Sequence, residues 1–178
     1  MGSQNDSFAH LHVHTEYSML DGAARIDELL RSAAEMGMPA IATTDHGYVF
    51  GAYEFWSKAR SYGITPIIGV EAYLTPGTHR RDKTRVRWGD DAASRDDVGG
   101  GGAYTHVTLL ARTTGGMHNL FRMSSMASME GHYFKPRIDR ELLARYSDGL
   151  LATTGCVGGE IQTRLRLGQY AEARRAAA

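Results

Sequence analysis

The stretch FAHLHVHTEYSMLDG, residues 8–22, places His10, His12 and His14 at alternate positions of one apolar segment. A β-strand turns every second side chain to the same face. We predict a strand over residues 8–14, and in such a strand the three imidazoles point to one place. This pattern indicates a metal or acid–base site more than ordinary packing.

On the C-terminal side of this stretch, short apolar segments alternate with segments in which apolar residues recur every three or four positions, as they do in a helix. Helical periods predict helices over residues 25–37, 51–63, 117–129, 141–146 and 159–178. Apolar runs predict further strands over residues 39–47, 64–74, 103–112 and 148–155. Alternation of strands and helices predicts an α/β fold with a parallel sheet, either open or closed as a barrel.

Two segments stand apart from this alternation. Residues 75–102 are polar and charged and end in four glycines, so we expect a long flexible loop. The arginines of HRRDKTRVRW within it could contact a DNA backbone, although a solvated loop is the preferred interpretation. The final YAEARRAAA has no helix stop, and five strands are too few for an eight-stranded barrel. We therefore expect the chain to be the front part of a longer protein.

The composition narrows the class of protein. Lys and Arg together number 20, as do Asp and Glu, so no global positive field would hold the chain on nucleic acid. There is one cysteine, Cys156, which excludes an internal disulfide and fits a reducing compartment. The sequence has neither a signal peptide pattern at its start nor an apolar run long enough for a membrane. We expect a cytoplasmic protein of ordinary globular composition.

Residues of metal-ligand type recur at or near the predicted strands, most of them at the carboxyl ends, where α/β folds gather their ligands. Each has an ordinary alternative: a strand histidine is more often a hydrogen-bonded core residue, Asp21 could cap a helix, and Cys156 could be a small buried thiol. Taken together they favour a metal site, because each buried polar group needs a partner. The candidates are His12, His14, Asp21, His46, Glu71, His106 and Cys156.

The set of ligands indicates the metal and the chemistry. Imidazole, carboxylate and thiolate suit Zn²⁺, with Mn²⁺ or Fe²⁺ as alternatives. Seven ligands are too many for one tetrahedral ion, so two or three divalent ions are expected, with a bridging carboxylate. Clustered divalent ions stabilise the attacking and leaving oxygens of a phosphoryl centre, which makes phosphate-ester hydrolysis the leading chemistry.

Four segments resemble a known family: HLHVHTEYSMLDGAARIDELL, AIATTDHGYVFGAYEFW, ITPIIGVEAYL and GLLATTGCVGGEI. They are similar to the N-terminal PHP (polymerase and histidinol phosphatase) domain of the bacterial replicative DNA polymerase III alpha subunits. The resemblance covers nearly the whole chain from Phe8. It implies a distorted (β/α)7 barrel, present here as its N-terminal part, with a metal cluster at the carboxyl ends of the strands.

By that resemblance, His12, His14 and Glu71 would hold one ion, and Asp21 and His46 another. Glu71 would also bridge to an ion held by His106 and Cys156. His12, His14, Asp21, His46 and Glu71 would carry a metal-dependent 3′–5′ proofreading exonuclease. Its partners would be the primer 3′ end of DNA, the rest of the alpha subunit, the sliding clamp and other replisome subunits, with no membrane.

Two alternatives stay open. The chain could be a free-standing metal-dependent phosphatase of the PHP superfamily, or a non-catalytic domain in which metal only braces the polymerase. The family also has a late Asp-x-His pair that completes its ligand set, and no such pair follows Cys156 in this sequence. The residue types alone do not fix the native ion or the number of ions.

Overall fold

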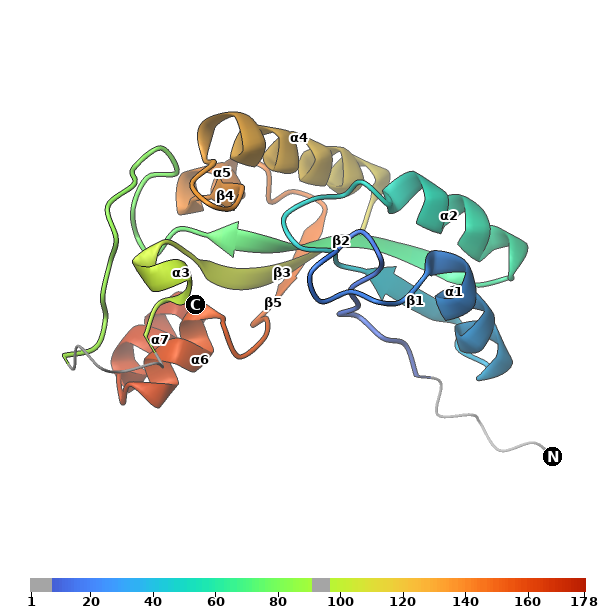
Figure 1. The fold of residues 1–178 in the computed structure, drawn as a ribbon, viewed down its shortest axis with the longest axis horizontal. Coiled ribbons are helices and arrows are strands. Elements are labelled where there is room, and N and C mark those ends of the chain that lie inside the picture. Colours follow the sequence, from blue (N-terminus) through green and yellow to red (C-terminus); the bar gives the residue numbers. More distant parts are fainter. Residues whose placement is uncertain (1–7, 91–96) are drawn as a thin grey trace.

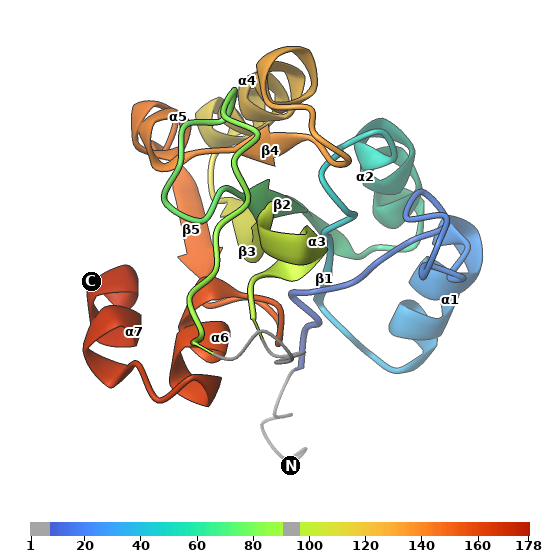
Figure 2. The same cartoon turned by 60° about the vertical axis from the view of Figure 1, so that its left-hand side comes forward.

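A computed structural model describes residues 8–90 and 97–178 of the chain. Five strands form one mixed sheet in the order β1–β2–β3–β5, with the short β4 also paired to β2. Helices lie around the outside of this sheet, and α6 and α7 form a separate pair near its β5 end (Figures 1 and 2). The strands are β1 Ala40–Thr43, β2 Thr65–Leu74, β3 Thr105–Ala111, β4 Arg137–Ile138 and β5 Leu150–Thr153.

The helices cover mainly one face of the sheet. Residues of α2 and α4 pack against β2, and α4 also packs against β3. Thr113 and Asp139 cap α4 and α5 by accepting hydrogen bonds from the backbone N–H groups of Gly116 and Leu142. The helices are α1 Ile26–Glu35, α2 Ala52–Ser61, α3 Gly99–Gly102, α4 Thr114–Glu130, α5 Arg140–Arg145, α6 Glu160–Arg166 and α7 Tyr170–Ala177.

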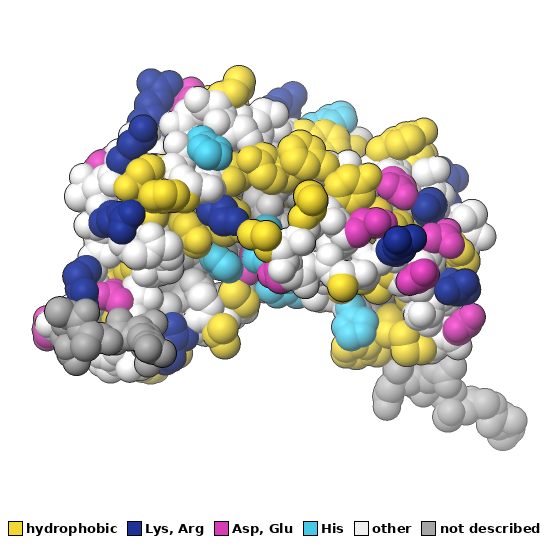
Figure 3. Space-filling view, viewed as in Figure 1, with side chains coloured by type: hydrophobic (Ala, Val, Ile, Leu, Met, Phe, Trp, Pro, Cys, Tyr) yellow, Lys and Arg dark blue, Asp and Glu magenta, His cyan; other side chains and the backbone are white. Residues whose placement is uncertain are grey.

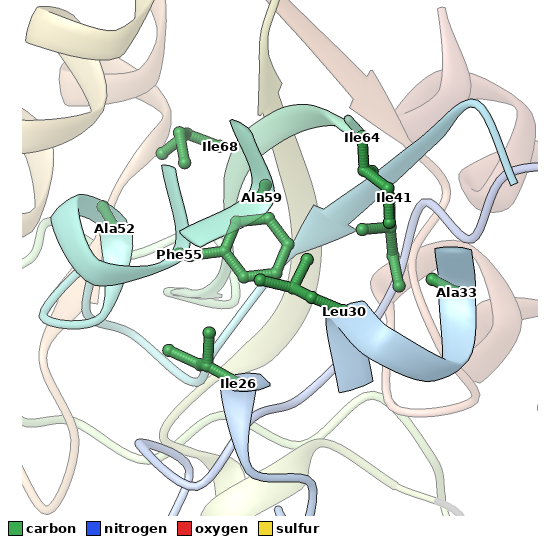
Figure 4. Close-up of a cluster of buried hydrophobic side chains, with 9 residues drawn as sticks. All are labelled: Ile26, Leu30, Ala33, Ile41, Ala52, Phe55, Ala59, Ile64 and Ile68. Carbon is green, nitrogen blue, oxygen red and sulfur yellow. The ribbon is translucent and has the colours of Figure 1, made fainter. Parts of the chain in front are cut away.

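The central strand β2 separates the core from the candidate site. Because side chains alternate along a strand, its even-numbered residues from Ile68 to Leu74 face the helices, whereas Glu71 and Tyr73 face the other way. One core cluster joins Phe55 of α2 to α1, β1 and the first half of β2 (Figure 4). A second joins the other half of β2 to β3, β4, α4 and α5. Packing of the other face of β2 into these two core clusters thus holds Glu71 in a fixed position.

The predicted parallel sheet is wrong in one respect: β3 runs antiparallel to both β2 and β5. The described residues of the connection from β2 to β3 form no long crossover helix, and without one a chain returns most directly in the opposite direction. His106 therefore lies near the start of its strand, not the end. It still reaches the carboxyl-end edge of β2, because the two strands run in opposite directions.

Two predicted elements also differ from the structure. Residues 8–14 are not a regular strand; they run beside β1, where the N–H groups of Ala42 and Thr44 donate to the carbonyls of His10 and Val13. The predicted helix over residues 159–178 is two helices, because Gly168 breaks it with a φ of +73°. The other four predicted helices are present, with ends that differ by a few residues.

The segment between β2 and β3 is attached to the body through two arginines. Arg80 is buried and pairs with Asp139 at 3.0 Å and Glu130 at 2.7 Å, contrary to its predicted place on a solvated loop. Arg137 is 1% exposed and donates to the carbonyls of Arg80 and Asp82. Residues 91–96, within the loop that we predicted to be flexible, lie outside the described residues, and its mobility stays a prediction. No described helix is long and apolar enough to cross a membrane.

Candidate metal centre

Glu71 lies at the centre of the candidate site and is 1% exposed. Three imidazoles surround its Oε2 atom: His14 Nε2 at 2.6 Å, His12 Nε2 at 3.1 Å and His46 Nδ1 at 3.4 Å. The ligand atoms of His12, His14 and Glu71 all lie within 4.8 Å of one another, which is within the reach of a single cation.

The other carboxylate oxygen of Glu71 faces a second group of donors. His106 Nδ1 lies 2.6 Å from Oε1, and the Cys156 thiol donates to Oε1 at 3.0 Å. The Cys156 Sγ and His106 Nδ1 atoms are themselves 3.3 Å apart. Glu71 therefore stands between two sets of ligand-type atoms, as a bridging carboxylate would.

A third group lies at the exposed side of the site. His46 Nε2 is 2.8 Å from Asp21 Oδ2, and His14 Nδ1 is 3.6 Å from the same oxygen. The Asp21 side chain is 53% exposed, in contrast to the buried Glu71. All seven candidates from the sequence thus come together, and their role as metal ligands stays a prediction.

Five separate parts of the chain build this cluster. Residues 12–21 cross beside β1, and His46 follows β1 in a turn whose Gly47 has a φ of +68°. A side chain at Gly47 would meet Tyr73 and Pro136 within 3.0 Å, so the turn requires glycine there. Glu71 and His106 come from β2 and β3, and Cys156 follows β5, which is parallel to β2 because both are antiparallel to β3.

Asp45, next to His46 in the sequence, has a structural role beside the candidate ligands. It is 4% exposed, and its carboxylate accepts hydrogen bonds from the N–H and hydroxyl of Thr15 and from the hydroxyls of Ser18 and Thr43. All of its lone pairs are engaged by neutral donors. Asp45 therefore fixes the loop that carries Asp21. In the sequence, the hydroxyl-bearing residues of the stretch TEYS, residues 15–18, were the signal that could have indicated this role.

The remaining histidines lie elsewhere. His10 is exposed and packs its ring against Phe8, so the predicted row of three imidazoles contributes only two to the cluster. His79, Asp139 and Glu141 form another group of ligand type. The Arg80 guanidinium already binds both of those carboxylates, which makes the group an ion-pair network.

Electrostatics in the cluster favour ionised groups. Burial would raise the pKa of Glu71, but hydrogen bonds from His106, His14 and Cys156 outweigh it and hold that pKa far below its usual range. Burial would likewise lower the pKa of His106, yet the contacts with Cys156 and Glu71 raise it to about 9. The Glu71 hydrogen bond also raises the pKa of His14 against the effect of burial. Without metal, protons on the imidazoles balance the buried carboxylate.

The donor set fits a divalent cation. His46 Nδ1 is buried and has no hydrogen-bond partner, although it points at the Glu71 carboxylate from 3.4 Å. A buried nitrogen without a partner is costly unless something else binds its lone pair. Nitrogen, oxygen and sulfur donors together suit Zn²⁺ and related ions.

We expect metal binding to release protons. Neutral imidazole and thiolate are the metal ligands, so Zn²⁺ must displace protons from His106, His14 and the Cys156 thiol, and at pH 7 about two to three protons should be released per chain. Calorimetric titrations in buffers of different ionisation enthalpy measure this number. Because the pKa of His106 is about 9, the share of the release that comes from its imidazole should disappear as the pH rises through that value. Proton-neutral binding at pH 7 would contradict the proposed electrostatics.

The same raised pKa values predict how the metal-free protein responds to pH. Stability from the charged His106 imidazole is fully present below its unfolded pKa of about 6.5 and is lost as pH rises through its folded pKa of about 9. Urea unfolding in a chelator should therefore show a decrease in the free energy of unfolding over that range.

A histidine- and carboxylate-rich cluster on the inner face of a helix-covered mixed sheet defines a class of α/β domain with a candidate metal centre. The chain belongs to the PHP domain family, whose model matches residues 10–178. This membership confirms the predicted PHP-type α/β fold class.

Sequence relatives of the chain within that family are DNA polymerase III alpha subunits. The chain is 57% identical over 179 residues to the DNA polymerase III subunit alpha of Saccharopolyspora erythraea, covering 97% of this chain and 15% of that protein. It is 55% identical over 177 residues to the DNA polymerase III subunit alpha of Mycobacterium tuberculosis, covering 99% of this chain and 15% of that protein. The chain thus spans about 15% of the length of these relatives. Among solved structures, an amidohydrolase from Chromobacterium violaceum matches with a TM-score of 0.43 at 22% identity, over 67% of this chain and 33% of that one.

Proposed function

We propose that the chain is the N-terminal PHP domain of a bacterial replicative DNA polymerase, a DNA polymerase III alpha subunit. In that setting its cluster would act as a metal-dependent 3′–5′ exonuclease that removes mispaired nucleotides during DNA replication. The identity of 57% to one such subunit supports the first part. As part of a polymerase the chain would work in the cytoplasm, with the primer 3′ end, the rest of the subunit, the sliding clamp and other replisome subunits as partners.

The observation that carries the nuclease proposal is the arrangement around Glu71. A carboxylate that is 1% exposed has imidazole nitrogens or a thiol within 3.4 Å of both its oxygens. A purely structural carboxylate would be expected to pair with backbone N–H groups or an arginine, as Asp139 does with Arg80. Nothing in the local packing requires so many metal-ligand atoms at one point.

The distances suggest how the ligands would divide. His12, His14 and Glu71 would hold one ion, Glu71 with His106 and Cys156 a second, and Asp21 with His46 a third. Bound divalent ions supply charge stabilisation for a phosphoryl group and a source of nucleophile near neutral pH. We favour Zn²⁺, with Mn²⁺ as the alternative.

The chain's own residues prepare the site for this chemistry. Glu71 carries a fixed negative charge because its pKa is far below its usual range, so it is ready to bind cations at any ordinary pH. Asp45 holds the loop of Thr15 and Ser18 in place and with it Asp21. Asp21 is the half-exposed member of the set, so a substrate approaching from solvent would meet it first.

A second candidate function is a structural brace. The cluster ties residues 12–21, His46, Glu71, His106 and Cys156 to one point, which links segments up to 85 residues apart through Glu71 and Cys156. In that case metal would raise stability without any hydrolysis. A free-standing phosphatase is less favoured, because the relatives are polymerase subunits.

We expect Asp21→Asn in the full-length polymerase to lower exonuclease activity on a mismatched primer by about 100-fold or more, while polymerisation is largely retained. The amide keeps the shape of the side chain but removes the charge next to His46 and His14. His10→Asn is the matched control, since His10 is an exposed histidine of the same segment outside the cluster. Wild-type nuclease rates in Asp21→Asn, with metal-dependent stability intact, would favour the brace.

A further inference from the structure

A groove of about 900 Å³ opens directly beside the candidate metal centre. Asp21, His46 and His106 line one end of it, and Tyr48, Phe50 and Tyr73 line its walls. This volume lies at the upper end of the range typical of ligand sites. Figure 3 shows hydrophobic side chains gathered along the middle of one face, with histidine and acidic side chains beside them.

The aromatic wall presents a flat surface to a ligand. The rings of Tyr48 and Phe50 are stacked, with centroids 4.5 Å apart and an interplanar angle of 13°. Phe50 lines the groove and is 67% exposed, and a side chain so exposed contributes little to the core. A nucleobase could extend this stack, because every base offers a π-face to an aromatic ring.

The charges of the groove limit what can enter it. Glu16, Asp21 and Glu54 line it, and Lys135 is the one Lys or Arg among its described lining residues. Its ammonium lies 5.5 Å from the centroid of the Tyr73 ring, on the wall near the cluster. These acids would repel a phosphate backbone that lay along the groove, so only the terminal nucleotide of a strand could enter it. A ligand with a flat ring and a single phosphate, held at the metal end, matches both features.

We propose that this groove receives the unpaired 3′-terminal nucleotide of single-stranded DNA, with its base stacked on Phe50 and its phosphate between the cluster and Lys135. The inference rests on the proposed nuclease function and specifies its substrate. A paired terminal base is held in the duplex by its hydrogen bonds and by stacking on its inner neighbour, whereas a mispaired terminal base leaves the stack at a lower cost. Stacking on Phe50 would thus select mispaired ends.

The test uses the full-length polymerase and oligonucleotides that end in 2-aminopurine, whose fluorescence is quenched on stacking. We compare wild type, Phe50→Ala, Phe50→Trp and the control Tyr53→Ala, an exposed aromatic of α2 outside the groove. Phe50→Ala should weaken the binding that produces quenching by roughly 5- to 150-fold, the range for loss of one stacked base, and Phe50→Trp should restore it. Tyr53→Ala should behave like wild type.

A second arm measures hydrolysis of oligonucleotides with a normal or an abasic 3′ end. Wild type should prefer the normal end by a similar factor, mainly through KM, and Phe50→Ala should remove the preference. Equal quenching and equal preference in wild type and Phe50→Ala would overturn the proposal, as expected if a protein segment covers the exposed Met19 and Leu20 at the groove instead. Absent hydrolysis with intact, Phe50-dependent quenching would overturn the nuclease function but support the groove.

Discussion

Glu71→Gln should abolish metal binding by the cluster, with a loss of affinity of at least about 100-fold for the tightest ion, and with it the exonuclease activity. The amide has nearly the same size, so packing on β2 is retained. It cannot supply the negative charge that faces His12, His14, His46, His106 and Cys156. A change in one bridging ligand disturbs every ion that it touches, which is why the effect should exceed the 10- to 100-fold typical of residues that only support a ligand.

Two measurements check this expectation. Calorimetry with Zn²⁺ reports the affinity, and NMR titration of the imidazole signals reports the pKa of His106, which should fall from about 9 towards or below its ordinary value. Glu35→Gln, at the exposed end of α1, is the matched control. Unchanged Zn²⁺ affinity in Glu71→Gln would show that the cluster is not a metal site.

The second large effect concerns stability. We expect Arg137→Met to lower the free energy of unfolding by about 3–5 kcal/mol, because it leaves several buried acceptors without a donor. The Arg137 guanidinium donates to the carbonyls of Gly131 at 3.0 Å, Ala103 at 3.3 Å, and Arg80 and Asp82 at 2.8 Å each. Burial lowers the pKa of the Arg137 guanidinium. Its replacement by methionine removes the hydrogen bonds to these four carbonyls.

Urea unfolding in the presence of a chelator measures this effect apart from metal binding. Arg122→Met serves as the control, since Arg122 is exposed on α4 and contacts only Asn119 among the described hydrogen bonds, so its change should stay within about 0.5 kcal/mol. A loss below 1 kcal/mol for Arg137→Met would mean that water replaces the guanidinium easily. The link between the segment after β2 and α4 would then be weaker than the contacts indicate.

The local pattern of the sequence determined the ingredients of the site. Helical period predicted α1, α2, α4 and α5, because an amphipathic helix needs apolar residues three and four positions apart. Apolar runs predicted the segments that became β1, β2, β3 and β5. The chemical types of the candidate ligands, and their place at or near strands, were evident from the same pattern.

Tertiary structure decided which of these residues meet. The first stretch is not a regular strand, so alternation did not bring His10 to the site with His12 and His14. The antiparallel direction of β3 turned His106 towards Glu71 from the start of its strand. Burial of Arg80 and Arg137 likewise depended on partners about 60 residues away, such as Asp139 for Arg80.

The physical reason is the distance along the chain over which each signal acts. Periodicity records which side chains share a face of one element, because that is fixed by the backbone geometry of neighbouring residues. The contacts of Glu71 with His106 and Cys156 join residues 35 and 85 positions apart. Those distances depend on strand direction and register, which arise only when the elements pack together, so the sequence determined the donors and the folded chain decided their arrangement around Glu71.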